Sequence, residues 1–148
     1  MKSKIARLIA TWFGCGYFPK GPGTVGSLAA VILVWYGVPA LWGALLLLVP
    51  AIWASSIVAR ELGNDPQIVV VDEVVGQWIA LSFSPVEPIP VIAAFLLFRL
   101  FDITKPWPVH QLERLESGWG IMMDDVAAGG LAAAVLWVLL RVTGGLNF

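Results

Sequence analysis

GSLAAVILVWYGVPALWGALLLLVPAIWASSIVA, from Gly26 to Ala59, is a run of 34 residues without one charged side chain. About 20 apolar residues are enough to cross the hydrocarbon core of a bilayer, so this run exceeds the length of a single membrane helix. A glycine and a proline two positions apart, Gly37 and Pro39, favour a tight turn in its middle. The sequence therefore predicts two helices, a short one over 24–36 and a spanning one over 41–59.

The rest of the 148-residue chain is also apolar, with 59% hydrophobic residues, 13% charged residues and a mean hydropathy of +0.85. Between Val74 and Phe98 the one charged residue is Glu87, and the prolines around it break any helix there. This pattern predicts a helical hairpin with arms over 72–83 and 90–103. Each arm is shorter than the roughly 20 residues of a membrane span. The arms could therefore enter and leave the bilayer on the same side, or the bilayer could be thinner around them.

The two ends of the chain complete the expected fold. The uncharged stretch 126–140 predicts a C-terminal membrane helix. Basic and apolar residues are mixed over 2–13 in a pattern typical of a helix that lies in the membrane interface. We expect an all-α fold of one membrane-embedded domain, residues 1–148: a polytopic membrane helical bundle with an N-terminal amphipathic interfacial helix, two spanning helices, a short helical hairpin and a C-terminal membrane helix.

The distribution of charges predicts which ends of these segments share a membrane face. With the N-terminus in the cytoplasm, eight of the nine basic residues fall on the cytoplasmic side and only Arg141 falls opposite. The positive-inside rule favours this orientation. The same threading places nine of the ten acidic residues on the cytoplasmic side and leaves only Glu87 on the other. The rare charged residues are therefore expected to converge on one face.

Two acidic pairs are the first candidates for a site, Asp72 with Glu73 and Asp124 with Asp125. An acid in the first turn of a helix is favoured by capping and by the helix dipole, so one member of each pair could be purely structural. Capping requires only one acid at a helix start, so the second acid of each pair indicates another role. Carboxylate oxygens without histidine or cysteine suit Mg²⁺, which keeps waters that a phosphate can replace.

A second group of candidates, Arg99, Asp102 and Lys105, follows at spacings that place the first two on one helix face. A guanidinium fork and an ammonium beside Mg²⁺ would neutralise the charge of a phosphomonoester. The structural alternative is an ion pair in which Arg99 holds Glu73 or Asp72 and fastens the hairpin.

The loop PKGPGTVGS, residues 19–27, is the third candidate. Its prolines and glycines predict a rigid loop at a helix start, where backbone N–H groups can meet a phosphate. The alternative is a loop that only begins a helix, with Thr24 or Ser27 as its N-cap.

Several functional classes are disfavoured by the same residues. Cys15 is the only cysteine and His110 the only histidine, which excludes multi-cysteine metal sites and phosphatases that need two histidines. A solvated interfacial side chain is the simpler interpretation of His110. The net charge is −1 and no basic stripe stands apart from the membrane segments, so no nucleic-acid partner is expected.

Four strings, GPGTVGSLAA, IVVVDEVVGQWIAL, FRLFDITKPWPV and GWGIMMDDVAAG, in this order and spacing, resemble the bacterial phosphatidylglycerophosphatase A family over about residues 14–131. The resemblance implies an Mg²⁺-dependent phosphatase of the bacterial inner (cytoplasmic) membrane, with its active site facing the cytoplasm. Its substrate would be the lipid phosphatidylglycerol phosphate, converted to phosphatidylglycerol and inorganic phosphate in phospholipid biosynthesis.

The resemblance also assigns roles to residues. The catalytic acids would be Asp72, Glu73, Asp102, Asp124 and Asp125. The metal ligands would be Asp72, Glu73, Asp124 and Asp125. The residues on the substrate phosphate would be Arg99, Lys105, Gly21, Gly23, Thr24 and Ser27, with Pro22 and Gly26 in the same loop. Asp65 also falls at a position that the family tends to fill with aspartate.

Other interpretations stay open at this point. Either a water attacks phosphorus directly or an aspartate attacks first, and the absence of a D-x-D pattern favours water. A small membrane transport or scaffold protein would explain the apolar composition, but neither a repeat nor a charge well inside a segment supports a transporter. A phosphatase acting on another lipid phosphate is a further alternative. A homo-oligomer is possible because the membrane segments leave little core.

Overall fold

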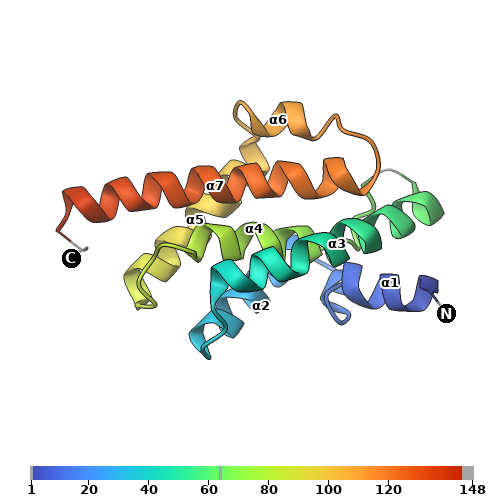
Figure 1. Ribbon diagram of the computed structural model, residues 1–148, viewed down its shortest axis with the longest axis horizontal. Coiled ribbons are helices and arrows are strands. Elements are labelled where there is room, and N and C mark those ends of the chain that lie inside the picture. The colour runs from blue at the N-terminus through green and yellow to red at the C-terminus, as the bar shows by residue number, and fades with distance from the viewer. Residues whose placement is uncertain (1, 64, 145–148) are drawn as a thin grey trace.

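The computed structural model describes residues 2–63 and 65–144, which form helices joined by turns and loops (Figure 1). The helices are α1 (Lys2–Ala10), the short 3-10 helix η1 (Cys15–Tyr17), α2 (Pro22–Trp35), α3 (Ala40–Leu62), α4 (Val71–Leu81), α5 (Pro88–Thr104), α6 (Val109–Leu112) and α7 (Gly118–Val142). No strand occurs among these residues. The predicted all-α bundle is confirmed.

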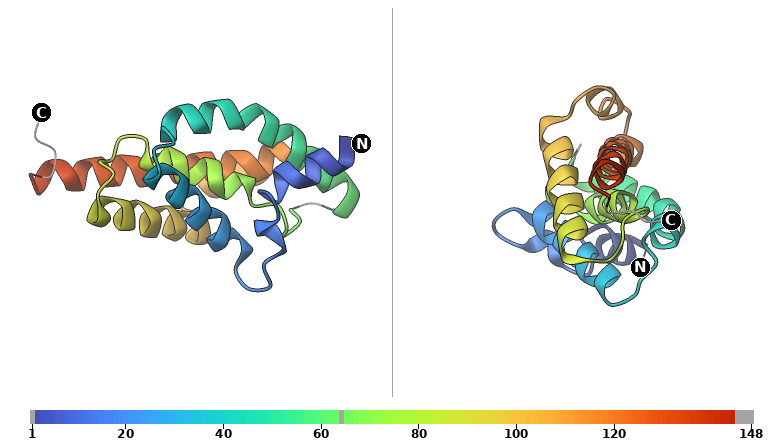
Figure 2. Two further views of the ribbon diagram at one scale, coloured as in Figure 1. Left: turned by 90° about the horizontal axis from the view of Figure 1, so that it is seen from below. Right: turned by 90° about the vertical axis from the view of Figure 1, so that its left-hand side faces the viewer.

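The helix α4 lies in the middle of the bundle and packs against α2, α3, α5 and α7 (Figure 2). Its sequence, VDEVVGQWIAL, is apolar around most of its circumference, and such a helix is stable when neighbours cover it on all sides. Trp78 fastens α4 to α2, because its Nε1 donates a hydrogen bond of 3.0 Å to the Ala30 carbonyl. The position of α4 places its first turn, with two acids, inside the protein.

The crossing of α4 and α7 depends on glycine. A Cβ on Gly76 would collide with the Phe98 ring and the Asp125 carbonyl, and a Cβ on Gly129 would collide with the Gly76 carbonyl. The two backbones therefore approach more closely than larger residues allow, as small residues commonly permit between membrane helices. This close crossing brings the acids of α4 and α7 to the same level.

Two helices, α3 and α7, are long and apolar enough to span a membrane, with 23 and 25 residues. Only a third of the most apolar window of each is buried inside the protein. Side chains such as Leu46 and Val49 of α3 are 76% and 73% exposed, and an apolar surface of this extent indicates contact with lipid. The 14 residues of α2 extend only about 21 Å, less than the roughly 30 Å hydrocarbon core.

Several observed boundaries differ from the predicted ones. The last helix begins at Gly118, eight residues before the predicted start, because Gly118 packs against Ser56 and the Ile52 carbonyl of α3 where no Cβ would fit. Consequently Asp124 and Asp125 lie in the second turn of α7, not before its first. The N-terminal helix ends at Ala10, and the backbone then turns through positive φ angles at residues 12 and 13. The short helices η1 and α6 were not predicted.

Candidate active site

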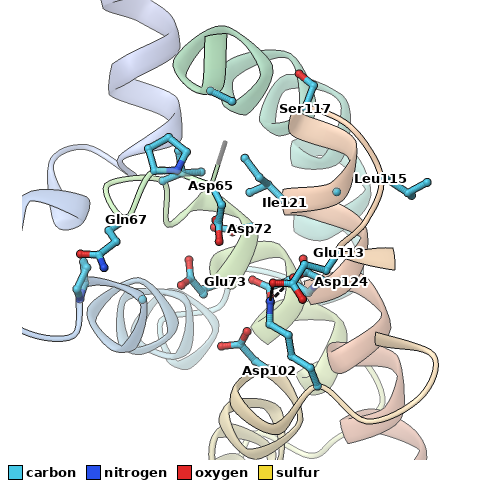
Figure 3. A pocket seen from close by; sticks show the side chains of 18 of the residues that line it. Asp65, Gln67, Asp72, Glu73, Asp102, Glu113, Leu115, Ser117, Ile121 and Asp124 are labelled. Atoms are coloured by element: carbon cyan, nitrogen blue, oxygen red, sulfur yellow. Dashed lines mark hydrogen bonds and ion pairs between the residues drawn. The ribbon is translucent and has the colours of Figure 1, made fainter. Parts of the chain in front are cut away.

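A cavity of about 930 Å³ opens where the starts of α2, α4 and α7 meet the ends of α3 and α5 (Figure 3). These are the helix ends that the charge distribution placed on one membrane face. Eight acidic and four basic side chains line the cavity. The acidic ones are Asp65, Asp72, Glu73, Asp102, Glu113, Glu116, Asp124 and Asp125, and the basic ones are Arg60, Arg99, Lys105 and Arg114.

Three carboxylates, those of Asp72, Glu73 and Asp125, form a compact group that we call the acidic trio. Each offers one oxygen, and the three oxygens lie within 4.8 Å of one another. Asp72 Oδ1 and Glu73 Oε2 are buried and have no hydrogen-bond partner among the described residues. Buried carboxylate oxygens without a partner are costly, so the trio has the properties of a cation site.

The donor set of the trio fits Mg²⁺, which prefers carboxylate oxygens and takes one or two of them beside retained waters. Asp124, which was also predicted as a metal ligand, has other partners in the structure. Its Oδ2 accepts a hydrogen bond of 2.9 Å from Lys105 Nζ, and its Oδ1 accepts one of 2.9 Å from the Asp125 N–H. The trio therefore contains three of the four predicted ligands.

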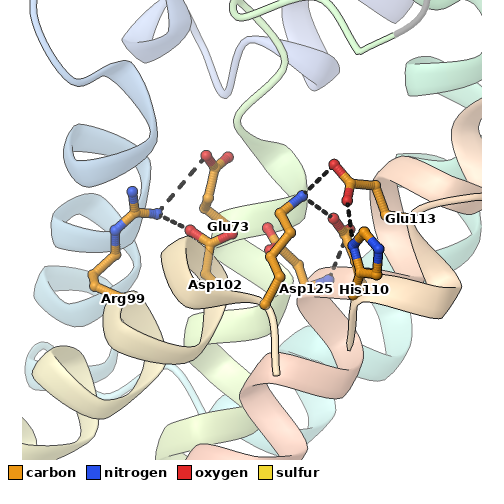
Figure 4. A network of polar contacts seen from close by, with 8 residues as sticks. Glu73, Arg99, Asp102, His110, Glu113 and Asp125 are labelled. Carbon is orange, nitrogen blue, oxygen red and sulfur yellow. Dashed lines mark hydrogen bonds and ion pairs between the residues drawn. The ribbon is translucent and has the colours of Figure 1, made fainter. Parts of the chain in front are cut away.

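The guanidinium of Arg99 lies on one side of Glu73 and Asp102 (Figure 4). Its Nη1 donates a hydrogen bond of 2.6 Å to Asp102 Oδ2 and lies 3.9 Å from Glu73 Oε1. The ion pair between Arg99 and Glu73, weighed above as a structural alternative, is thus present. The Arg99 side chain also lines the cavity and keeps 17% of its surface exposed, so the guanidinium can still meet an anion there.

Lys105 lies on the other side and joins three parts of the chain. It follows α5, and its Nζ donates hydrogen bonds to Asp124 of α7 and, at 2.7 Å, to Glu113 Oε1. Burial of the amine lowers its pKa, but these two hydrogen bonds outweigh that effect and raise the pKa of Lys105 above its ordinary value. The ammonium in turn lowers the pKa of Glu113. Both groups are therefore charged near neutral pH.

The segment 105–117, which we call the strap, connects α5 to α7 and contains α6. It closes one side of the cavity through Glu113, Arg114, Leu115 and Ser117. His110 is exposed on the strap, with its Nδ1 3.6 Å from Glu113 Oε2 and its Nε2 3.3 Å from Arg114 Nη2. None of the strap residues beyond Lys105 was predicted as a site residue, since nothing in one sequence distinguishes them from a solvated loop.

The glycine-rich loop contributes its first part to the cavity. Gly21, Pro22 and Gly23 line the wall, and Gly21 has a φ of 62°, a left-handed conformation that glycine adopts without strain. A Cβ on Gly23 would collide with the Glu73 carboxylate, so the glycine is what lets this acid reach its position.

Thr24 and Ser27, predicted in the same loop, do not line the cavity. Ser27 is fully buried, and its hydroxyl donates a hydrogen bond of 3.1 Å to the Gly23 carbonyl. This placement gives Ser27 a structural contact inside α2. It gives no support to the prediction that the two hydroxyls bind phosphate.

The rest of the cavity wall was not among the predicted site residues. Its exposed members, which with Glu113 and Leu115 of the strap we call the mouth of the cavity, are Arg60, Asp65, Gln67, Arg114 and Glu116, with Pro66 and Ser117 next to them in the sequence. The other wall residues are Ala59, Val69, Gly120 and Ile121. Asp65 was noted in the sequence only through the family resemblance, and it has a positive φ of 54° in the turn before α4. With twice as many acids as bases, the cavity attracts divalent cations, and a phosphate can enter only when such charge is neutralised.

The sequence matches the family described as Phosphatidylglycerophosphatase A over residues 8–140. A protein of Bacteroides thetaiotaomicron, named as a candidate phosphatidylinositol-3-phosphatase, is 43% identical over 89% of this chain and 94% of its own length. The proteins named phosphatidylglycerophosphatase A in Escherichia coli (strain K12) and Haemophilus influenzae are each 37% identical over 89% of this chain, and the matches cover 81% and 86% of their lengths. No solved structure matches the chain significantly.

Proposed function

The chain belongs to the phosphatidylglycerophosphatase A family of phosphatases, and we propose that it hydrolyses phosphatidylglycerol phosphate to phosphatidylglycerol and inorganic phosphate in phospholipid biosynthesis. The observation that carries this proposal is the acidic trio. Two of its buried oxygens have no hydrogen-bond partner in the described part of the chain, and the trio lies in one cavity with Arg99 and Lys105. A cation site beside two fixed cations is the arrangement that a phosphomonoester requires.

We assign the metal to Asp72, Glu73 and Asp125, with Mg²⁺ as the cofactor. When bound there, Mg²⁺ would neutralise charge on the phosphoryl oxygens and lower the pKa of a water. The buried oxygens of Asp72 and Glu73 that have no hydrogen-bond partner among the described residues support the assignment, because a bound cation would supply a partner for both.

The protein side chains have separate parts in the proposed reaction. The guanidinium of Arg99 donates to a phosphoryl oxygen, while Asp102 fixes its orientation. Lys105 donates to a second phosphoryl oxygen and is held in place by Asp124. A water attacks phosphorus, the bond from phosphorus to the glycerol oxygen breaks, and that oxygen leaves with a proton. A carboxylate of the cavity accepts one proton of the attacking water, and that proton passes to the leaving glycerol oxygen.

The membrane location follows from the same geometry. The cavity lies at the ends of the two candidate spans, α3 and α7, so a lipid can keep its acyl chains in the bilayer while its head group reaches the trio. We propose the bacterial cytoplasmic membrane, with the cavity on the cytoplasmic side, because this orientation places eight of nine basic residues in the cytoplasm.

A second candidate substrate is a phosphoinositide monophosphate. It is favoured by the 43% identity to the Bacteroides protein, whose name refers to phosphatidylinositol 3-phosphate. Both lipids carry a phosphomonoester on a head group that is itself linked to the lipid by a phosphodiester.

A substrate panel tests the proposal. We would measure phosphate release by the detergent-purified protein from phosphatidylglycerol phosphate, phosphatidylinositol 3-phosphate and phosphatidic acid at matched surface concentration. We expect the highest kcat/KM with phosphatidylglycerol phosphate. A higher value with the inositol lipid would assign the second substrate, and release from none of them by folded protein would refute a lipid phosphatase.

A further inference from the structure

The mouth of the cavity differs in charge from its interior. Around the acidic trio, Arg99 and Lys105 both have carboxylate partners. At the mouth, Arg60 and Arg114 line the cavity and are exposed, and neither has a carboxylate within ion-pair distance among residues 2–63 and 65–144. Both arginines therefore keep donors for an anion that is not the reacting phosphate, although Arg114 Nη2 also lies 3.3 Å from His110 Nε2.

The two arginines come from different elements. Arg60 is in the last turn of α3, and Arg114 is on the strap, three residues before Ser117. Three exposed acids, Asp65, Glu113 and Glu116, share the mouth, and Glu113 forms an ion pair with Lys105, so the two arginines are matched there by the two other acids. In the interior five acids face two bases. An anion that is not neutralised by metal is therefore accommodated at the mouth.

The start of α7 adds further donors at the mouth. Ser117 precedes α7 and lines the cavity. Within residues 2–63 and 65–144 its side chain makes no capping hydrogen bond, and its buried Oγ has no hydrogen-bond partner. The first N–H groups of a helix have no partner within the helix, and they favour an anion at this end. An anion held by Arg114 would lie beside these donors.

We propose that Arg60, Arg114 and the start of α7 form a second anion subsite, which binds the phosphodiester of a lipid whose phosphomonoester lies at the acidic trio. This inference rests on the proposed function and adds a determinant of specificity to it. Phosphatidic acid has a phosphomonoester but no phosphodiester, so the subsite selects against it. Guanidinium groups suit this role because they bind phosphate oxygens in pairs and remain charged.

Direct binding tests the subsite without any turnover. Dihexanoyl phosphatidylglycerol carries the diester alone, and its Kd can be measured by calorimetry, with dihexanoylglycerol reporting the binding of acyl chains. Loss of one hydrogen bond to a charged group raises Kd about 10- to 140-fold. We expect such a rise for the double variant Arg60→Gln/Arg114→Gln. The control Lys4→Gln removes an exposed charge of α1 outside the cavity and should leave Kd unchanged.

Turnover then tests specificity. In the double variant we expect kcat/KM for phosphatidylglycerol phosphate to fall about tenfold or more, whereas the value for phosphatidic acid changes less than about threefold. An equal fall for both lipids, or an unchanged Kd for the diester lipid, would overturn the subsite. A wild-type protein that binds the diester lipid through these arginines but releases no phosphate would instead overturn the proposed function and leave the subsite standing.

Discussion

Replacing Gly23 by alanine is expected to remove activity with little effect on the fold. A Cβ at this position would collide with the carboxylate of Glu73 and lie 3.3 Å from Arg99 Nη1. The end of a side chain can move more easily than the backbone, so the Glu73 carboxylate is displaced from the acidic trio while α2 and α4 stay in place.

The expected magnitudes for activity and stability differ. Alanine in a helix is favoured over glycine by about 0.5–1 kcal/mol, which offsets much of the cost of moving Glu73 and lengthening its ion pair with Arg99. We therefore expect the stability to change by no more than about 1 kcal/mol. A misplacement of a catalytic group by about 1 Å costs on the order of 100-fold in rate, equivalent to about 2.7 kcal/mol of barrier.

Phosphate release and thermal unfolding in the same detergent measure the two quantities. Gly130→Ala is the matched control, because Gly130 is exposed on α7 and a Cβ there meets nothing within 4 Å. The control should keep full activity. A Gly23→Ala protein with wild-type kcat/KM would refute the conclusion that this glycine positions Glu73. A Gly23→Ala protein that fails to fold would refute the expectation that the substitution lowers activity but leaves stability nearly unchanged.

Three further outcomes are expected. Arg99→Lys should lower kcat/KM about 10- to 100-fold, because an ammonium lacks the planar, paired N–H donors with which a guanidinium binds the oxygens of carboxylate and phosphate groups. Kinetics equal to wild type would contradict this expectation. Gly76→Ala should destabilise the fold by about 1–3 kcal/mol in thermal unfolding, since its Cβ meets the Phe98 ring and the rigid backbone of α7, and an unchanged Tm would refute the close crossing. Because Lys105 lowers the pKa of Glu113, their ion pair stabilises the strap above the unfolded pKa of about 4.3 and is lost as the pH falls through the lower folded value. Hydrogen exchange of the strap amides, corrected for the intrinsic rate, should therefore accelerate below about pH 4. In the Glu113→Gln variant the strap amides should exchange at this faster rate already at about pH 7. Slow exchange in that variant would argue against the conclusion that the ion pair between Lys105 and Glu113 holds the strap.

Much of the fold could be predicted because apolar runs and prolines mark membrane helices strongly. The predicted span over 41–59 lies within Ala40–Leu62, and the turn at Gly37 and Pro39 separates α2 from α3 as expected. The start of α7 could not be predicted in this way. It depends on Gly118 fitting against α3, a contact between distant parts of the chain that leaves no local signal.

The candidate site could also be predicted only in part. The acids and bases at the ends of apolar stretches were recognisable, because an unpaired charge near a membrane segment is costly. Which acids group together depends on the crossing of α4 and α7, so the separation of Asp124 from the trio by Lys105 was not foreseeable. The roles of Glu113, Arg60 and Arg114 arise from the way the strap and α3 border the cavity, and single exposed charges carry no such information in the sequence.

The central claim is that the acidic trio holds the Mg²⁺ used for hydrolysis of the lipid phosphomonoester. It is tested most directly by phosphate release from phosphatidylglycerol phosphate, with Mg²⁺ and with chelator, for the wild type, Asp72→Asn and Asp125→Asn. Glu87→Gln is the control, because Glu87 is exposed at the start of α5 and does not line the cavity. For the wild type and the control we predict turnover that chelator abolishes and added Mg²⁺ restores. For both aspartate variants we predict that turnover is lost even with Mg²⁺. Undiminished turnover in chelator, or in folded Asp125→Asn protein, would contradict the claim.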